Sequence, residues 1–433
     1  MLAEDYRVTS TPSKLTLSPM SWEQYLRESA VPRATIDNFL HLPEWAKFDP
    51  ELGYVLHNSL IKWGIDGSRA IATFQSTGAR SRFLYASRTP RINSYGNSFT
   101  ECNQVSDGET WQEYLGAHFG EPIGNYGVGG HGVYQAYRRM LREEKTHNGA
   151  EYVILYVWGD DPTRSLMRAR WGAIYHWFKD AAFRQRVLFH GNPWAHIEMD
   201  LTSGCFIEKE NPLSTPELVY KMCDPEWMLD YLYDDLAVQL TAYIGMPNDG
   251  RPGSIIDLDR KRIDRLADAL DVRFDWSSGA DVIGQSVTLL NVYGQRATNH
   301  ILDRARVFAQ STKKKLLVVL NYTARPDAFK DPIVAYDGAR ADQKIVEHLV
   351  NKDFYFFDMN AVHQREYEEM KGSYREYMSR YHVQGASHYN PRGNHLFAYS
   401  IKSKLLEVLD PKPLPYRDLD TTTIDFSGYL PGA

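Results

Sequence analysis

Ser98 lies in the segment Tyr-Gly-Asn-Ser-Phe-Thr (95–100), directly after a short stretch with strand character. A serine hydroxyl is a weak nucleophile. It becomes reactive at an exposed tight turn, beside a base that takes its proton, with donors aimed at the developing oxyanion. Gly96 has no Cβ and permits a sharp turn at the end of a strand, where the sites of α/β proteins lie. The segment therefore predicts Ser98 as a nucleophile, and the alternative is an ordinary serine that caps the next helix.

A glycine-dense turn, Asn-Tyr-Gly-Val-Gly-Gly-His-Gly (125–132), precedes a segment with helical character. Backbone N–H groups at the start of a helix can hold an anion or an oxyanion. A phosphate-binding loop is a competing interpretation, although the Gly-Lys-Ser/Thr ending of such loops is absent. A plain turn is the other alternative. His131 either donates to the substrate or fills the helix N-terminus.

His388 stands just ahead of an Asn-Pro helix start, with Asn390 as the expected N-cap and Pro391 at the first helical position. A histidine held by this loop would reach a serine at the sheet edge and act as its base. The alternative is that His388, one of 14 histidines in the chain, is a structural residue.

Taken in this order, these segments resemble the SGNH/GDSL hydrolase superfamily. Four segments are each similar to one of its sequence blocks: 96–100 to Gly-Asp-Ser, 125–130 to Asn-x-Gly-x-x-Gly, 159–161 to Gly-x-Asn-Asp, and 388–393 to His-Pro-Asn-x-x-Gly. The resemblance spans about 89–175 and 286–408. The residues that follow the first two blocks are similar to a subgroup that includes relatives of bacterial polysaccharide O-acetyl esterases and acetyltransferases.

The resemblance implies Ser98 as nucleophile, His388 as base, and the N–H groups of Ser98 and Gly130 as oxyanion donors. The family's third donor is an Asn side chain, and the matching residue here is Asp160. An ionised carboxylate only accepts hydrogen bonds. We expect either that burial and the neighbouring Asp161 keep Asp160 protonated, or that Asp160 faces elsewhere and the oxyanion hole has two donors.

The family's acid that orients the histidine normally lies three residues before it, where this chain has Gly385. The remaining candidates for orienting His388 are a main-chain carbonyl, Asp160 or Asp161, or a carboxylate from elsewhere. Asp358 is one such candidate, because it ends a predicted core strand. A Ser–His dyad is the description that the sequence favours.

The elements that must position these residues alternate between strand and helix. We expect strands at 91–95, 152–158, 316–320 and 354–357, and helices at 109–119, 133–144, 345–350 and from 391 onward. The continuous apolar run 152–158 suits a strand that is covered on both faces. The pattern predicts a three-layer α/β/α fold with a parallel sheet, of the SGNH or flavodoxin-like type.

Five segments are expected along the chain. They are an N-terminal extension of strands and loops (1–88), the first half of the α/β core (89–175), an aromatic-rich helical insertion that forms a cap or lid (176–285), the second half of the core (286–412), and a C-terminal tail (413–433).

Composition excludes several classes of partner. The formal net charge of the 433 residues is -6, with acidic and basic side chains interspersed, which disfavours nucleic acid. No apolar run approaches the roughly 20 residues of a membrane helix. We expect no metal, since no HExxH motif or cysteine pair occurs, and no cofactor. The 3 cysteines are far apart, which predicts reduced thiols and a cytoplasmic protein.

The leading prediction is a hydrolase that cleaves a carboxylic ester, such as an O-acetyl group on a carbohydrate, through an acyl-Ser98 intermediate. An O-acyltransferase would use the same residues. The other alternative is a glycan-binding module with a decayed catalytic set, which Asp160 and Gly385 motivate.

Overall fold

The computed structural model describes residues 20–42, 45–61, 64, 68–169, 194–245, 253–321, 340, 342–383 and 388–417. Within them, the central sheet consists of five strands: β5 (Ile92–Gly96), β6 (Ile123–Gly127), β7 (Tyr152–Trp158), β10 (Lys315–Asn321) and β11 (Phe356–Asp358). Their spatial order is β11-β10-β7-β5-β6, and every pairing is parallel. In chain order this is 2-1-3-4-5, a doubly wound arrangement. The predicted α/β fold with a parallel sheet is confirmed.

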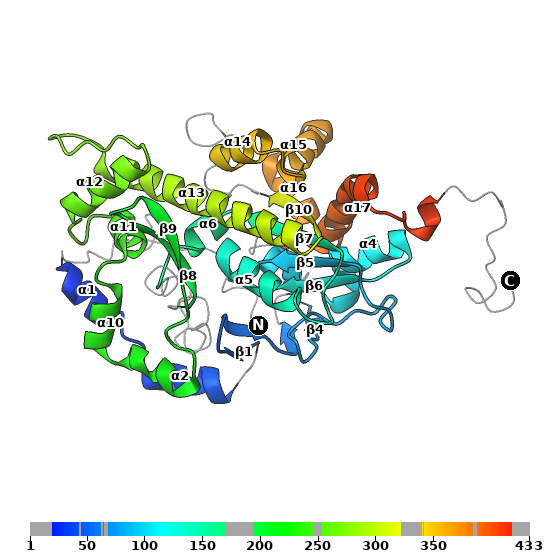
Figure 1. The fold of residues 1–433 in the computed structure, drawn as a ribbon, viewed down its shortest axis with the longest axis horizontal. Helices are drawn as coiled ribbons and strands as arrows, with labels where there is room; N and C mark the ends of the chain where they lie inside the picture. The colour runs from blue at the N-terminus through cyan, green and yellow to red at the C-terminus, as the bar shows by residue number, and fades with distance from the viewer. Residues whose placement is uncertain are drawn as a thin grey trace, which may run out of the picture.

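Helices cover both faces of the sheet (Figure 1): α4 (Trp111–Phe119), α5 (Val133–Glu143), α13 (Val282–Ser311), α14 (Gln343–Asn351), α15 (Met359–Met370), α16 (Tyr374–Tyr381) and α17 (Pro391–Val408). Alternate residues of β7 enter two separate apolar cores because successive side chains of a strand point to opposite faces. Val153, Leu155 and Val157 join the core that contains α5 and α13. Ile154 and Tyr156 join the core that contains α4 and α17. The predicted apolar run is therefore a strand buried on both faces.

The N-terminal extension begins with two helices that the sequence analysis did not predict. Its elements are α1 (Trp22–Glu28), α2 (Arg33–His41), β1 (Ala46–Asp49), β2 (Gly53–Leu56), β3 (Ser59–Ile61) and β4 (Ala70–Ala72). Ser21 caps α1 by accepting a hydrogen bond from the Gln24 N–H, and the buried Trp22 and Leu26 lie one turn apart. An extension of strands and loops alone was therefore too simple a description.

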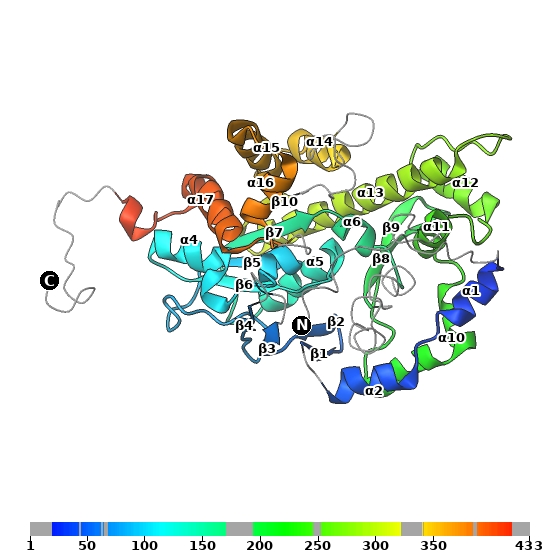
Figure 2. The same cartoon turned by 180° about the vertical axis from the view of Figure 1, so that it is seen from behind.

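The insertion combines a hairpin with helices: β8 (His196–Asp200), β9 (Cys205–Lys209), α9 (Pro216–Val219), α10 (Pro225–Leu232), α11 (Leu236–Ile244) and α12 (Arg260–Ala269). The β8–β9 hairpin was not predicted for this aromatic-rich helical insertion. Figure 2 shows α1 beside α10, where Arg27 pairs with Glu226. The aromatic positions Trp171, Tyr175, Trp177 and Phe178 lie outside the described residues.

Capping residues set several boundaries. The helix expected at 109–119 starts at Trp111, because Asp107–Glu109 forms a 3₁₀ turn and Thr110 caps α4. Further 3₁₀ turns lie at Tyr220–Cys223 and Leu414–Tyr416. The N-cap predicted for the last helix is confirmed: the Asn390 side chain accepts from the Gly393 N–H at 2.9 Å. No helix in the described ranges has both the length and the apolar character needed to cross a bilayer.

Candidate active site

The sheet reverses its winding direction at β5, because β6 lies on one side of it and β7 on the other. Loops at the carboxyl ends of strands meet at such a switch point, and ligands of doubly wound sheets bind there. The loop after β5 carries Ser98, the loop after β6 carries Gly130, and the loop after β7 carries Asp160. The topology therefore gathers these predicted site residues at one edge of the sheet.

Ser98 is the first residue of the short helix α3 (Ser98–Glu101), two residues after β5 ends. The turn requires glycine at position 96, because a Cβ there would lie 2.2 Å from the Thr100 Oγ1 atom. Asn97 caps α3 by accepting from the Phe99 N–H at 2.8 Å. This close-packed turn gives Ser98 a fixed position at the carboxyl end of β5.

His388 lies against Ser98: its Nε2 atom is 2.7 Å from the Ser98 Oγ. The loop before α17 holds the histidine, since Val383 N–H donates to the His388 carbonyl and a β-bridge joins His382 to Tyr389. The ring also contacts the Phe99 ring, with centroids 5.2 Å apart. The structure thus brings together the predicted nucleophile and the predicted base, which are 290 residues apart in the chain.

Gln104 occupies the orienting position beside His388, where the sequence analysis looked for an acid. Its Oε1 lies 2.7 Å from the His388 Nδ1. For Nε2 to accept the Ser98 proton, Nδ1 must carry the proton of the neutral ring. The amide oxygen of Gln104 accepts a hydrogen bond from this Nδ1–H. Gln104 is buried and sits in a left-handed turn with φ +73°. A neutral amide therefore selects the productive tautomer.

The carboxylates considered as orienters have other partners. Asp161 accepts from Asn97 Nδ2 at 2.8 and 2.9 Å and from the Trp158 N–H at 3.0 Å. Burial raises the pKa of Asp161 to about 7, against the opposing charge of Arg164. Asp161 therefore positions Asn97, the residue before the nucleophile, and is not the group that orients His388.

Asp358 and Asp160 also have partners other than His388. Asp358 pairs with Arg340 and caps α15. Asp160 forms an ion pair with Arg164, Oδ1 to Nη2 at 2.6 Å. Gly385 lies outside the described residues. The expectation that one of these aspartates orients His388 is therefore corrected in favour of Gln104.

The glycine turn after β6 contains a peptide group that Tyr54 holds in place. Tyr54 of β2 donates its hydroxyl to the Gly129 carbonyl at 2.7 Å, and this carbonyl belongs to the same peptide as the Gly130 N–H. In a trans peptide the N–H points opposite to the carbonyl, so Tyr54 fixes its direction. Gly130 has φ +84°, and within the described chain its N–H donates to no protein acceptor. The N-terminal extension therefore supports the predicted oxyanion loop.

Glu101 and His131 support this glycine turn through a hydrogen bond and a ring contact. Glu101 accepts the Gly129 N–H at 2.8 Å, and burial raises the pKa of Glu101 to about 7 against the charge of Arg80. The His131 ring packs edge-on against Tyr54, with centroids 4.9 Å apart. Burial holds the pKa of His131 far below its ordinary value, so the ring is neutral. His131 is therefore a packing residue in this conformation, with its side chain buried.

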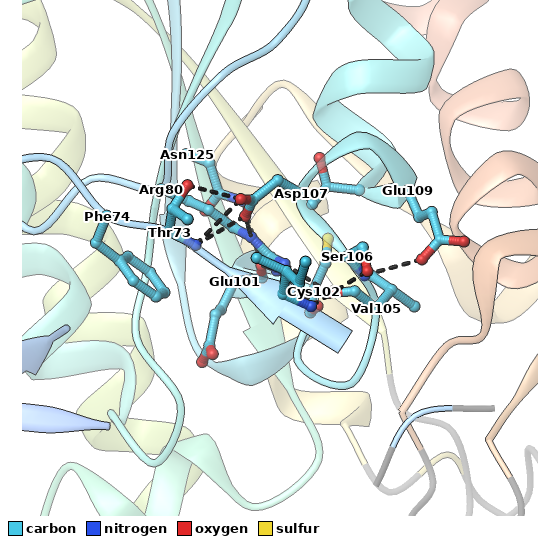
Figure 3. Close-up of polar contacts among 12 residues, drawn as sticks. Thr73, Phe74, Arg80, Glu101, Cys102, Val105, Ser106, Asp107, Glu109 and Asn125 are labelled. Carbon is cyan, nitrogen blue, oxygen red and sulfur yellow. Dashed lines mark hydrogen bonds and ion pairs between the residues drawn. The ribbon is translucent and has the colours of Figure 1, made fainter. Parts of the chain in front are cut away.

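Arg80 organises the segment that carries Gln104 (Figure 3). Its guanidinium donates to four groups of the segment that follows α3: the Asp107 carboxylate at 2.8 Å and the carbonyls of Glu101 at 2.6 Å, Cys102 at 2.8 Å and Val105 at 2.6 Å. Both side chains of the ion pair are 1% exposed. Thr73 adds a further hydrogen bond to Asp107. Gln104 therefore lies on a loop whose two ends are hydrogen-bonded to the buried Arg80.

Three residues of the site were not found by sequence reasoning. Gln104 is a neutral amide, whereas the orienting groups expected beside His388 were a carboxylate or a main-chain carbonyl. Tyr54 lies in the N-terminal extension, and Arg164 (11% exposed) lies one helical turn after Asp160. The i,i+4 spacing of Asp160 and Arg164 was the one signal available for any of them. Within the described chain, no group of three or more potential metal-ligating side chains comes together.

Comparison with known proteins identifies no family. The sequence matches no protein-family profile and no curated protein. One of the solved structures that it resembles aligns over 73% of this chain and 96% of its own, with 13% sequence identity and a TM-score of 0.34. A TM-score this low supports no conclusion about fold or function.

We expect Arg80→Met to destabilise the protein by about 3 to 5 kcal/mol, because it leaves the buried Asp107 charge uncompensated. Urea denaturation followed by circular dichroism measures the change. Arg27→Met is the matched control: its ion pair with Glu226 is equally short, 2.8 Å, but its side chains are 43% and 64% exposed. Loss of that pair is expected to cost at most about 1 kcal/mol. Equal costs for the two variants would contradict a special role for Arg80.

The pKa of His388 predicts the pH range in which Ser98 is activated. Burial, helped by the charge of Arg164, lowers the pKa of His388 to about 4. Only the neutral ring takes the Ser98 proton, so activation is present above this pKa and is lost as pH falls through it. We expect the rate of Ser98 labelling by a fluorophosphonate to show an acid midpoint near pH 4.

Gln104→Glu should raise this midpoint, because a carboxylate beside Nδ1 favours the protonated ring. Gln104→Leu is the control: it removes the acceptor without adding charge, and should slow labelling without raising the midpoint. A wild-type midpoint at about 6.5, the ordinary value for histidine, would contradict the lowered pKa of His388. So would equal midpoints in wild type and Gln104→Glu.

Proposed function

We propose that this protein is an SGNH-type serine hydrolase that cleaves a carboxylic ester through an acyl-Ser98 intermediate. The observation that carries the proposal is the continuous hydrogen-bonded chain Ser98 Oγ to His388 Nε2, and His388 Nδ1 to Gln104 Oε1, both contacts at 2.7 Å. It lies at the switch point of a parallel sheet, where the loop after the neighbouring strand β6 carries Gly130. A glycan-binding module without catalytic activity would not require these hydrogen bonds between Ser98, His388 and Gln104.

The geometry suggests the order of steps. His388 takes the proton of Ser98 as Oγ attacks the ester carbonyl, and the N–H groups of Ser98 and Gly130 stabilise the oxyanion that forms. His388 then gives the proton to the departing alcohol, which leaves the acyl group on Ser98. Water enters, loses a proton to His388 and attacks the acyl carbon, which releases the acid and restores the serine.

The substrate class rests on the sequence resemblance. The subgroup that the chain resembles acts on O-acetyl esters of polysaccharides, so we propose an O-acetylated carbohydrate as the substrate. Acetate is small, and a compact pocket behind Ser98 would suffice for it.

Ser98→Ala should reduce release of p-nitrophenol from p-nitrophenyl acetate by about 10⁴-fold or more, because no other group can form the acyl intermediate. Mass spectrometry of the fluorophosphonate-treated wild type should place the label on the peptide that contains Ser98. Ser94→Ala is the matched control: Ser94 lies on β5, where its hydroxyl donates to the Gly124 carbonyl, and the variant should remain active. Undiminished release by purified Ser98→Ala would rule out the proposal.

A further inference from the structure

Arg164 is a buried cation that has no role in the steps above. It ends α6 (Asp161–Arg164), the short helix that follows β7. Its Nη2 lies 2.6 Å from Asp160 Oδ1, and its Nη1 lies 3.4 Å from Asp161 Oδ1. Asp161 in turn holds Asn97, the residue before the nucleophile. The guanidinium is therefore linked to the Ser98 turn through one carboxylate.

A second set of contacts places Arg164 beside the oxyanion loop. A Cβ added at Gly132 would lie 2.9 Å from the Arg164 Cβ, so the two backbones are in direct contact two residues after Gly130. The charge of Arg164 also adds to burial in lowering the pKa of His388. Arg164 is thus linked to the nucleophile turn through Asp161, and it packs against the oxyanion loop at Gly132.

One donor of this arginine is unused. The Nε atom is buried and makes no hydrogen bond within the described part of the chain. A buried guanidinium N–H without an acceptor is costly, and such a group is satisfied when an anion arrives. The position matching the third oxyanion donor of the SGNH family holds Asp160, whose charge would oppose an oxyanion.

We propose that Arg164 is a catalytic residue: its guanidinium neutralises Asp160 and its Nε–H supplies the third stabilising interaction to the oxyanion formed at Ser98. This inference rests on the proposed function. It replaces the amide donor of the family by an arginine that belongs to this chain's own α6. The oxyanion hole then consists of two main-chain N–H groups and one side-chain cation.

Four variants test the proposal: Arg164→Gln, Arg164→Lys, Asp160→Asn and the double variant Asp160→Asn/Arg164→Gln. Arg164→Gln leaves the Asp160 charge beside the oxyanion, so kcat for p-nitrophenyl acetate should fall roughly 100-fold to 1,000-fold with KM little changed. Arg164→Lys keeps the charge without the Nε–H and should lie between wild type and Arg164→Gln. Asp160→Asn is the reference for the double variant, because it shows what an amide at position 160 does while Arg164 is present.

The double variant separates catalysis from folding. It removes the opposing charge and provides an amide donor at position 160, so it should recover at least tenfold of the activity lost in Arg164→Gln. Arg164 also pairs with the buried Asp161, and the double variant does not restore that contact. A role confined to holding Asp161 would therefore leave both variants equally impaired, and this result would overturn the proposal.

Inhibition by phenylboronic acid gives a readout that needs no turnover. Boronic acids form a tetrahedral, negatively charged adduct with an active serine, so Arg164→Gln should bind phenylboronic acid at least tenfold more weakly than wild type. Equal inhibition, or kcat of Arg164→Gln within threefold of wild type, would overturn the role of Arg164 while Ser98 labelling upholds the hydrolase. A wild type that neither labels nor hydrolyses the ester would overturn the proposed function itself.

Discussion

The buried guanidinium of Arg80 is the constraint on which the rest of the site depends. Four donors of one side chain satisfy a carboxylate and three carbonyls of the irregular segment 101–107, which would otherwise bury polar groups without partners. Because these polar groups have hydrogen-bond partners, the segment can hold Gln104 at a positive φ beside His388. The arginine comes from the N-terminal extension, so the extension is an integral part of the site.

The α/β core and its switch point were accessible from sequence because their signals are local. The apolar run of β7 and the Asn390–Pro391 helix start depend on neighbouring residues only, and both lie where expected. The contact between Ser98 and His388 was also anticipated, through a resemblance in their flanking residues. Their catalytic role remains a prediction.

Other features depend on contacts that no local pattern encodes. Gln104 orients His388 only because Arg80 shapes the loop that carries it. The residues next to Gln104 in the sequence do not distinguish it from a glutamine on the surface. The direction of the Gly130 N–H depends on Tyr54, 75 residues before the Gly129 carbonyl that it binds. Asp160 differs from the Asn of the family that the sequence resembles, and its partner Arg164 was visible only as a charge one helical turn away.

The 290 residues between Ser98 and His388 have a consequence for how activity arises during synthesis. Proteins emerge from the ribosome from the N-terminus, so the serine and its glycine turn leave the tunnel long before the histidine exists. Contacts of such high sequence separation form late in folding. In the proposed hydrolase, the Ser98 hydroxyl would therefore stay inert on every incomplete chain, and its reactivity towards an acyl donor would report that α17 has docked.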